Sequence, residues 1–259
     1  MPSGREVDPK IMSFLGHLEE LRQVLFASAL AVLLCTVVCW FFSGQILDWI
    51  VVRTVGQAQF LRPTEAFATR FKIALFLGFL ASFPYVAFRV WTFIGPGLFR
   101  SERAVVVPAA VSSTFLFVAG MAFSYFVLTP MMLKLLVNFG TEHVSANIAV
   151  GFLMGFLLKM SLATGILFQL PLVVAVLTRV GVVTPGYLIK KWRHAVLIIF
   201  IIAAVVTPGD GPSQIVLAAP VVVLYFASII VSRAIVRGQR RAEARSAAAA
   251  GAGTGEGAS

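Results

Sequence analysis

Charged side chains stand directly against a long apolar segment near the start of the chain. Residues 13–22 contain Glu19, Glu20 and Arg22, and an apolar run begins at about Val24. The carboxylate of Glu20 falls where water and hydrocarbon meet, so a cationic partner is worth more to it than to a fully exposed acid. Leucines recur at helical spacing through this stretch, which predicts an amphipathic helix at a membrane surface. The alternative is that Glu19 and Glu20 only cap and solubilise the end of a membrane helix.

The composition is typical of a polytopic membrane protein. The 259 residues are 59% hydrophobic and only 12% charged, and several apolar runs reach the roughly 20 residues that span a bilayer. The net charge of +10 does not indicate nucleic-acid binding, because the basic residues lie between and after the apolar runs. The histidines and cysteines match no metal-ligand pattern, and the common hydrolase and nucleotide-binding motifs are absent. We therefore expect no enzyme, metal or cofactor.

The apolar runs predict an all-α integral membrane protein with six transmembrane helices. We expect spans at about residues 24–42, 71–90, 108–128, 150–177, 195–206 and 215–231. The fourth span should break at Pro171, and the Gly151-x-x-x-Gly155 pair near its start would allow close helix packing. The fifth span is short and joins the sixth through a tight turn at residues 207–212, which predicts a short helical hairpin. Glu65 is expected in the first turn of a helix before the second span.

The orientation follows from the positions of the basic residues. Fifteen lie at the amino terminus, in the second-to-third and fourth-to-fifth connectors and in the tail, against five on the opposite side. Because lysine and arginine concentrate on the cytoplasmic side, both termini are predicted to be cytoplasmic. Residues 1–12 form a polar tail, residues 13–233 the membrane domain, and residues 234–259 a basic, then Ala/Gly-rich tail that we expect to be disordered.

With this topology, Glu20 and Glu102 are expected on the same cytoplasmic face. In this setting the chain resembles TatC, the multispanning receptor subunit of the twin-arginine protein translocase. The matching stretches are residues 17–22, 91–99, 101–103, 120–126 and 206–210. Each stretch is a weak signal alone, but their order and predicted topology make them specific, and they are spread over about residues 15–233.

The resemblance implies a receptor that binds the twin-arginine signal peptides of folded cargo proteins. Glu20 and Glu102 would receive the two arginines, because a carboxylate accepts two parallel hydrogen bonds from a guanidinium group. The residues implied at this site are Glu20, Arg22, Phe93, Leu98, Glu102 and Arg103. The alternative for Glu102 is a local ion pair with Arg100 or Arg103.

The resemblance also implies partner proteins. The short hairpin would dock single-span subunits similar to TatA and TatB, for export driven by the proton motive force. The docking residues implied are Thr207, Asp210, Ser213 and Gln214. The alternative is an ordinary polar turn. Membrane lipid and self-association complete the expected interactions.

Two polar residues lie deep in the fourth predicted span. Many family members carry a glutamate just before the proline, where this chain has Gln169. Because an amide hydrogen-bonds but does not titrate, the hypothesis is that the protein needs polarity at this depth and not a proton on residue 169. Lys159 is either an intramembrane polar residue or a side chain that snorkels to the outer face. A small-molecule secondary transporter is the alternative class, and it would be expected to show internal repeats, which the sequence lacks.

Overall fold

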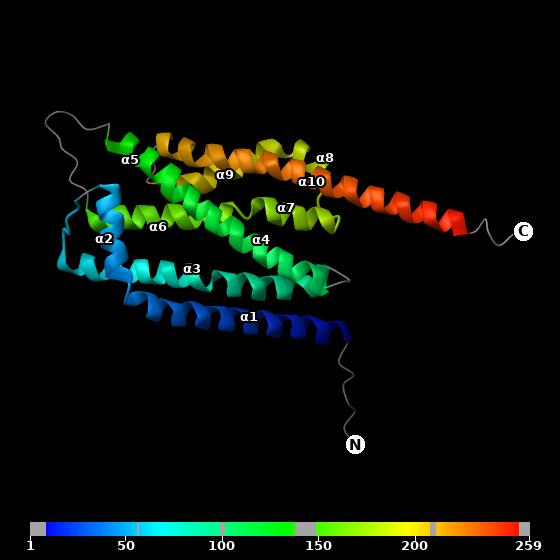
Figure 1. Ribbon diagram of the computed structural model, residues 1–259, viewed down its shortest axis with the longest axis horizontal. Coiled ribbons are helices and arrows are strands. Elements are labelled where there is room, and N and C mark those ends of the chain that lie inside the picture. The colour runs from blue at the N-terminus through cyan, green and yellow to red at the C-terminus, as the bar shows by residue number, and fades with distance from the viewer. Residues whose placement is uncertain (1–8, 56, 99–101, 138–148, 208–210, 254–259) are drawn as a thin grey trace, which may run out of the picture. The chain divides into compact units, whose positions relative to one another are not determined.

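The computed structural model describes residues 9–55, 57–98, 102–137, 149–207 and 211–253 (Figure 1). In these ranges the regular elements are helices, and an isolated parallel bridge joins Gln59 to Ala149. Five helical segments are long and apolar enough to cross a membrane: Gly16–Trp40, Pro63–Ile94, Val106–Leu135, Val150–Arg179 and Gly211–Arg241. The sixth, Trp192–Val206, is apolar but has only 15 residues. This confirms the predicted all-α fold with one short member of the fifth-to-sixth hairpin.

The chain forms two compact units, and the first contains residues 1–115 and 140–159. Its elements are α1 (Pro9–Trp40), α2 (Ser43–Thr54), α3 (Pro63–Leu98), the first part of α4 (Glu102–Phe123) and the start of α6 (Val150–Leu167). Residues 116–139 and 160–259 make the second unit. It contains the remainder of α4 and α6, the π-helical turn η1 (Ser124–Leu128), α5 (Thr129–Val137), α7 (Leu170–Arg179), α8 (Pro185–Lys190), α9 (Trp192–Val206) and α10 (Gly211–Gly253).

In the first unit, α1 and α3 approach each other closely at a glycine. A Cβ atom added to Gly78 of α3 would lie 2.6 Å from the backbone nitrogen and Cα of Thr36 on α1. A small residue at this position lets the two backbones meet, as at many helix contacts in membranes. On the outer side of α1, Leu25 and Phe26 are 61% and 70% exposed. Large exposed apolar side chains are expected where a helix faces lipid.

Helix α1 is continuous from Pro9 to Trp40. The stretch of residues 13–22 is therefore helical, as predicted, but it is not a helix separate from the first span. No proline or glycine lies between Gly16 and Trp40, so the helical hydrogen bonding continues without a break. Glu20 is consequently carried on a straight extension of the span.

The second unit is organised around α10. The Thr178 and Ser232 hydroxyls, both buried, lie 2.8 Å apart and join α7 to α10. The Tyr225 hydroxyl donates to the Leu188 carbonyl over 2.8 Å and joins α10 to α8. The predicted interruption of the fourth span is confirmed, because α6 ends at Leu167 and α7 begins at Leu170, with proline in its first turn.

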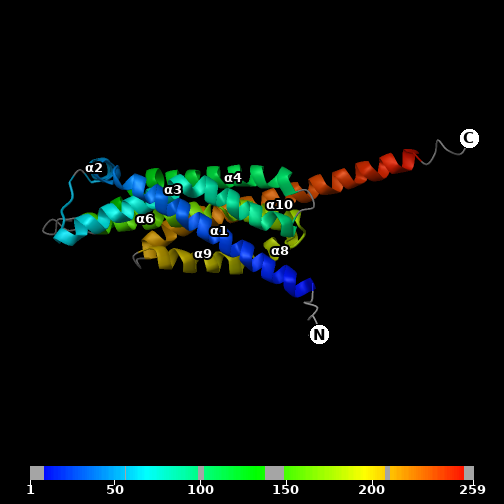
Figure 2. The same ribbon diagram turned by 90° about the horizontal axis from the view of Figure 1, so that it is seen from below.

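The end of α10 differs from the sequence prediction. Disorder was expected for residues 234–259, but α10 continues to Gly253 and extends beyond α7, α8 and α9 in both views (Figures 1 and 2). Alanine and arginine, which dominate this segment, are good helix formers. A helix that is already nucleated adds such residues at little cost. Residues 254–259 lie outside the described residues.

Candidate functional site

Glu20 lies on α1 close to the last turns of α3. Its carboxylate is 49% exposed, and Oε2 lies 3.9 Å from Nδ1 of His17, one turn earlier on the same helix. The His17 ring stacks on the ring of Phe93 from α3, with centroids 4.4 Å apart and planes inclined by 11°. This aromatic contact fixes the charged end of α1 against the end of α3, and it leaves the Glu20 carboxylate accessible to a ligand.

The neighbouring acid has a different arrangement. Glu19 Oε1 lies 3.8 Å from a terminal guanidinium nitrogen of Arg22, and both side chains are about two-thirds exposed. An exposed pair of this kind contributes little to stability. Glu19 therefore matches the alternative prediction of a solubilising charge, and it provides a natural comparison for Glu20.

The second predicted acid, Glu102, is the first residue of α4. An acid at a helix N-terminus is stabilised by the partial positive charge of the unpaired backbone N–H groups. Phe93 is half-buried on α3. For Leu98, Glu102 and Arg103 the structure describes the backbone only, and the predicted ion pairs of Glu102 lie outside the described side chains. The structure thus stacks His17, the neighbour of Glu20, on Phe93 and places Glu102 at the start of the following helix.

Two polar residues of the hairpin form hydrogen bonds within the hairpin. The Thr207 hydroxyl donates to the Ala203 carbonyl over 3.0 Å, and the Gln214 amide nitrogen donates to the Phe200 carbonyl over 2.9 Å. Thr207 is 6% exposed and Ser213 is fully buried, whereas Asp210 lies outside the described residues. The bond from Gln214 links α10 back to α9, and its side-chain oxygen takes no part in that bond.

Gln169 lies in the break between α6 and α7. Its backbone N–H donates to the Ile166 carbonyl over 3.0 Å, and its carbonyl accepts from Val173 over 2.9 Å. The side chain is half-buried, and Lys159 on α6 is exposed. The short turn at Phe168 and Gln169 therefore keeps backbone groups paired around the proline, which a membrane interior requires.

The residue before Gln169 is anchored by aromatic packing. The ring of Phe168 lies 5.7 Å from that of Phe123, centroid to centroid. A Cβ atom on Gly120 would lie 2.8 Å from Cγ of Phe168 and 2.9 Å from the carbonyl oxygen of Thr164. Gly120 thus allows Phe168 to lie against α4 and holds the break in place.

A polar contact that the sequence analysis missed joins Glu65 to Gly151. Glu65 Oε2 accepts a hydrogen bond from the Leu61 N–H over 2.8 Å, and Oε1 accepts one from the Gly151 N–H over 2.7 Å. The adjacent Val150 N–H donates to the Gln59 carbonyl over 3.1 Å. The first-turn position of Glu65 was visible in the sequence, but its second partner lies 86 residues further along the chain. Only the fold brings these groups together.

The role of the Gly151-x-x-x-Gly155 pair is also different from the prediction. A Cβ atom on Gly151 would lie 2.7 Å from Cγ and 2.9 Å from Cδ of Glu65, so this glycine admits a carboxylate. Around Gly155, the described residues place no heavy atom within 4 Å of an added Cβ. Among the described residues, the pair does not act as a joint helix-packing motif.

These features define a polytopic helical membrane protein whose candidate functional residues are charged groups at helix ends and polar groups at helix breaks. The comparisons with known proteins give the family. The family model for the Sec-independent protein translocase protein (TatC) matches residues 16–220. The chain belongs to the TatC family.

Relatives and solved structures agree with this assignment. The Sec-independent protein translocase protein TatC of Carboxydothermus hydrogenoformans is 32% identical over 88% of this chain and 95% of its own length. The chloroplastic TATC protein of Arabidopsis thaliana is 37% identical over 84% of this chain and 65% of its own length. A crystal structure of the twin-arginine translocase receptor TatC matches with a TM-score of 0.76 and 30% identity, covering 85% of this chain and 99% of that one.

Family membership decides between the classes of protein that the sequence left open. The chain is a multi-pass membrane subunit of the twin-arginine protein translocase. Members of this family are translocase components and not enzymes. The alternative of a small-molecule secondary transporter is therefore set aside.

Proposed function

We propose that this subunit is the receptor for signal peptides carrying two adjacent arginines, and that Glu20 and Glu102 bind the two guanidinium groups. The observation that carries the proposal is the stack of His17 on Phe93, which holds the Glu20 end of α1 beside the end of α3. Glu102 begins α4, the next helix along the chain. Two acids on separate helices suit two arginines whose side chains point in different directions along an extended peptide.

The surroundings of Glu20 support a role in binding a cationic ligand. The Glu20 carboxylate is 49% exposed and lies 3.9 Å from His17 Nδ1, so a guanidinium group of a ligand can reach it. Phe93 supplies an apolar surface beside the acid, and Leu98 would extend that surface toward Glu102. Arg22 and Arg103, which flank the two acids, would limit how many cationic groups the site accepts.

The subunit would also assemble with partner subunits and have a defined orientation in the membrane. The hairpin of α9 and α10 would receive the membrane helix of a single-span subunit similar to TatA or TatB, for export driven by the proton motive force. Thr207 uses its hydroxyl hydrogen, and Gln214 uses one of its two amide hydrogens, within the hairpin. The Gln214 side-chain oxygen and its second N–H would then be the groups that meet a partner. Ser213 and Asp210 lie in or beside the same turn. Both termini would face the cytoplasm, as the distribution of basic residues favours.

A peptide-binding measurement tests the receptor site. The full chain in detergent is titrated with a labelled signal peptide carrying two arginines, and with the same peptide carrying two lysines. Loss of one charged hydrogen-bond partner costs about 1.5–3 kcal/mol. Because Glu20 is half exposed, we expect a loss of binding free energy at the lower end of this range. Glu20→Gln should therefore weaken binding of the arginine peptide about tenfold. Glu102→Gln should have a similar effect.

Glu19→Gln is the matched control, since it removes the same charge one residue away. It should leave peptide affinity within about twofold, as expected for a solvated acid in a weak ion pair. Equal peptide affinity in the wild type and in the Glu20→Gln, Glu102→Gln double variant would reject the receptor site.

A further inference from the structure

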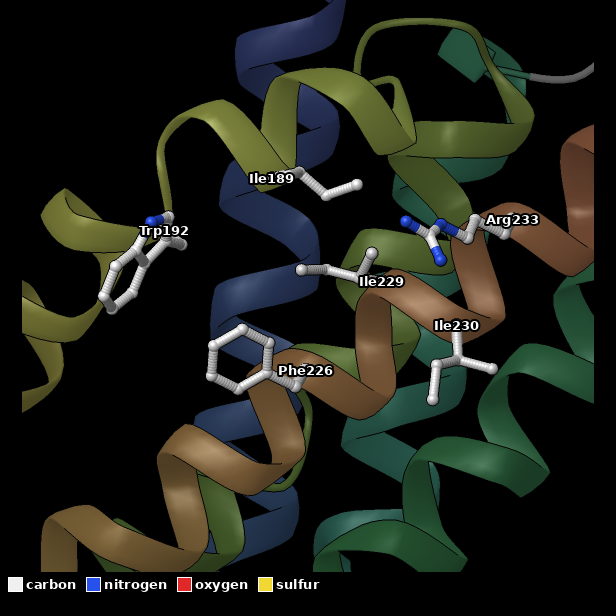
Figure 3. Close-up of a pocket in the computed structure, with 6 residues that line it drawn as sticks. All are labelled: Ile189, Trp192, Phe226, Ile229, Ile230 and Arg233. Carbon is white, nitrogen blue, oxygen red and sulfur yellow. The ribbon is translucent and has the colours of Figure 1, made fainter.

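An apolar groove lies between α8, the start of α9 and the middle of α10 (Figure 3). Its volume is about 560 Å³. The residues that line it are Ile189, Trp192, Phe226, Ile229, Ile230 and Arg233. Five of the six side chains are large and apolar, and the sixth is an arginine, so the groove combines a hydrocarbon-like wall with one cation.

The walls of the groove are held by contacts below and beside it. The hydrogen bond from the Tyr225 hydroxyl to the Leu188 carbonyl, 2.8 Å long, fixes α10 against α8. The Trp192 and Phe226 rings pack at a centroid distance of 6.4 Å, across the side where α9 begins. Tyr225 and Leu188 are both buried. The groove is therefore formed by packed elements and does not depend on a ligand for its shape.

The charge at the groove is positive. In Figure 3 the Arg233 guanidinium group points toward Ile189 and Ile229, over the apolar wall. A second guanidinium group, that of Arg193, lies 5.8 Å from the Trp192 ring centroid. Between residues 160 and 242 the sequence contains eight lysines and arginines and a single acid, Asp210. An anionic group that enters here meets the Arg233 guanidinium group, and no acid is among the residues that line the groove.

The groove would accommodate only about one turn of a partner's helix. A helix with side chains is about 10–12 Å wide, so 560 Å³ corresponds to about 5–7 Å of its length, or one turn. A flexible hydrocarbon chain does not need the width of a helix. Basic pockets beside membrane helices are known to bind anionic lipid headgroups, and arginine pairs with phosphate through two parallel hydrogen bonds.

We propose that this groove is a binding site for an anionic phospholipid. An acyl chain lies against Trp192, Phe226 and Ile230, and the phosphate is bound by Arg233, with Arg193 adding to the positive field. The site is independent of the signal-peptide site and uses none of its residues. It would give the translocase subunit a preference for membrane regions rich in acidic lipid.

Native mass spectrometry of the detergent-solubilised full chain tests the site. Phosphatidylglycerol and phosphatidylcholine are titrated separately, and the affinity of the first bound lipid is measured for each. The wild type should prefer phosphatidylglycerol. Arg233→Gln should weaken phosphatidylglycerol binding about tenfold, because a charged hydrogen bond to phosphate is lost. Phosphatidylcholine has the same phosphate but also a quaternary ammonium group that the basic groove disfavours, so its weaker binding should fall by less and the preference for phosphatidylglycerol should shrink. Arg245→Gln removes the same charge from an exposed position further along α10 and should change neither lipid.

A second pair of variants tests the apolar wall. Ile230 lines the groove and Val223 lies two turns earlier on α10, and each is 67% exposed, so tryptophan at either position should not disturb the core. Ile230→Trp should weaken binding of both lipids several-fold, while Val223→Trp should weaken neither.

Two results would overturn the proposal. The first is an unchanged preference for phosphatidylglycerol in Arg233→Gln. The second is unaltered lipid binding in Ile230→Trp together with lost co-purification of a single-span partner, which would assign the groove to a protein helix.

Discussion

Replacing Gly151 with alanine should destabilise the protein, because the new methyl group would occupy the space of the Glu65 side chain. The added Cβ would lie 2.7 Å from Cγ and 2.9 Å from Cδ of Glu65. The carboxylate cannot simply rotate away, since it accepts hydrogen bonds from Leu61 at 2.8 Å and from Gly151 itself at 2.7 Å. Either α6 shifts away from α3 or the bond to the Gly151 N–H is lost.

A matched control on the same helix separates the cost of the close contact from other effects of the added methyl group. Gly155→Ala adds the same methyl group where the described residues leave 4 Å of open space, and both variants share the gain in helix propensity. The difference between them is therefore the overpacking cost, about 1–3 kcal/mol. In proteins of about 150–250 residues this corresponds to a melting temperature lower by about 2–4 °C for each kcal/mol.

Thermal unfolding of the detergent-solubilised variants, followed by circular dichroism, measures this difference. A double-mutant cycle identifies its cause: in a Glu65→Ala background the penalty of Gly151→Ala should largely disappear, because the clashing atoms are gone. If Gly151→Ala unfolds at the same temperature as Gly155→Ala, the close contact with Glu65 does not govern the stability of this region.

Three further predictions concern other parts of the chain. Gly78→Ala should cost at least about 1–3 kcal/mol by overpacking, because its Cβ would meet the backbone of Thr36, which cannot rotate away; thermal unfolding against wild type measures it, and unchanged stability would contradict the close α1–α3 contact. At equal membrane levels, Gln169→Glu should support export and Gln169→Leu should impair it, since we expect polarity and not titration to matter at the break. Full export of a folded reporter by the leucine variant would show that residue 169 contributes only to packing. A cysteine at Asn147 should react with a membrane-impermeant reagent in intact cells and one after Arg241 should not, and the opposite pattern would reverse the proposed orientation.

Hydrophobic patterning determined the number and place of the membrane helices. Apolar runs of about 20 residues have few alternatives to a spanning helix, because every backbone polar group in lipid must be paired within the segment. The break before Pro171 agrees with the loss of a helical donor at proline, but Pro84 and Pro220 lie within continuous helices, so proline alone does not determine where a span breaks. The candidate acids Glu20 and Glu102 were also found in the sequence, from their motifs and their position at the ends of apolar runs.

The extent of two helices was less predictable. The end of α10 was expected to be disordered from its composition, but alanine and arginine continue a helix that the membrane span has already nucleated. The leucine spacing of residues 13–22 predicts an amphipathic helix at the membrane surface, yet in the structure this stretch is the beginning of α1. In both cases local composition was a weaker determinant than continuity with a stable span.

Contacts between distant segments required the tertiary structure. The Glu65 carboxylate and the Gly151 N–H lie 86 residues apart in sequence and 2.7 Å apart in space, and the His17 and Phe93 rings, from two different helices, are stacked at 4.4 Å. Each of these residues has an adequate local explanation as a helix-end charge, a helix-packing glycine or an ordinary aromatic. The pattern of a single helix determines which face is apolar, but the packing of several helices determines which side chains on those faces meet.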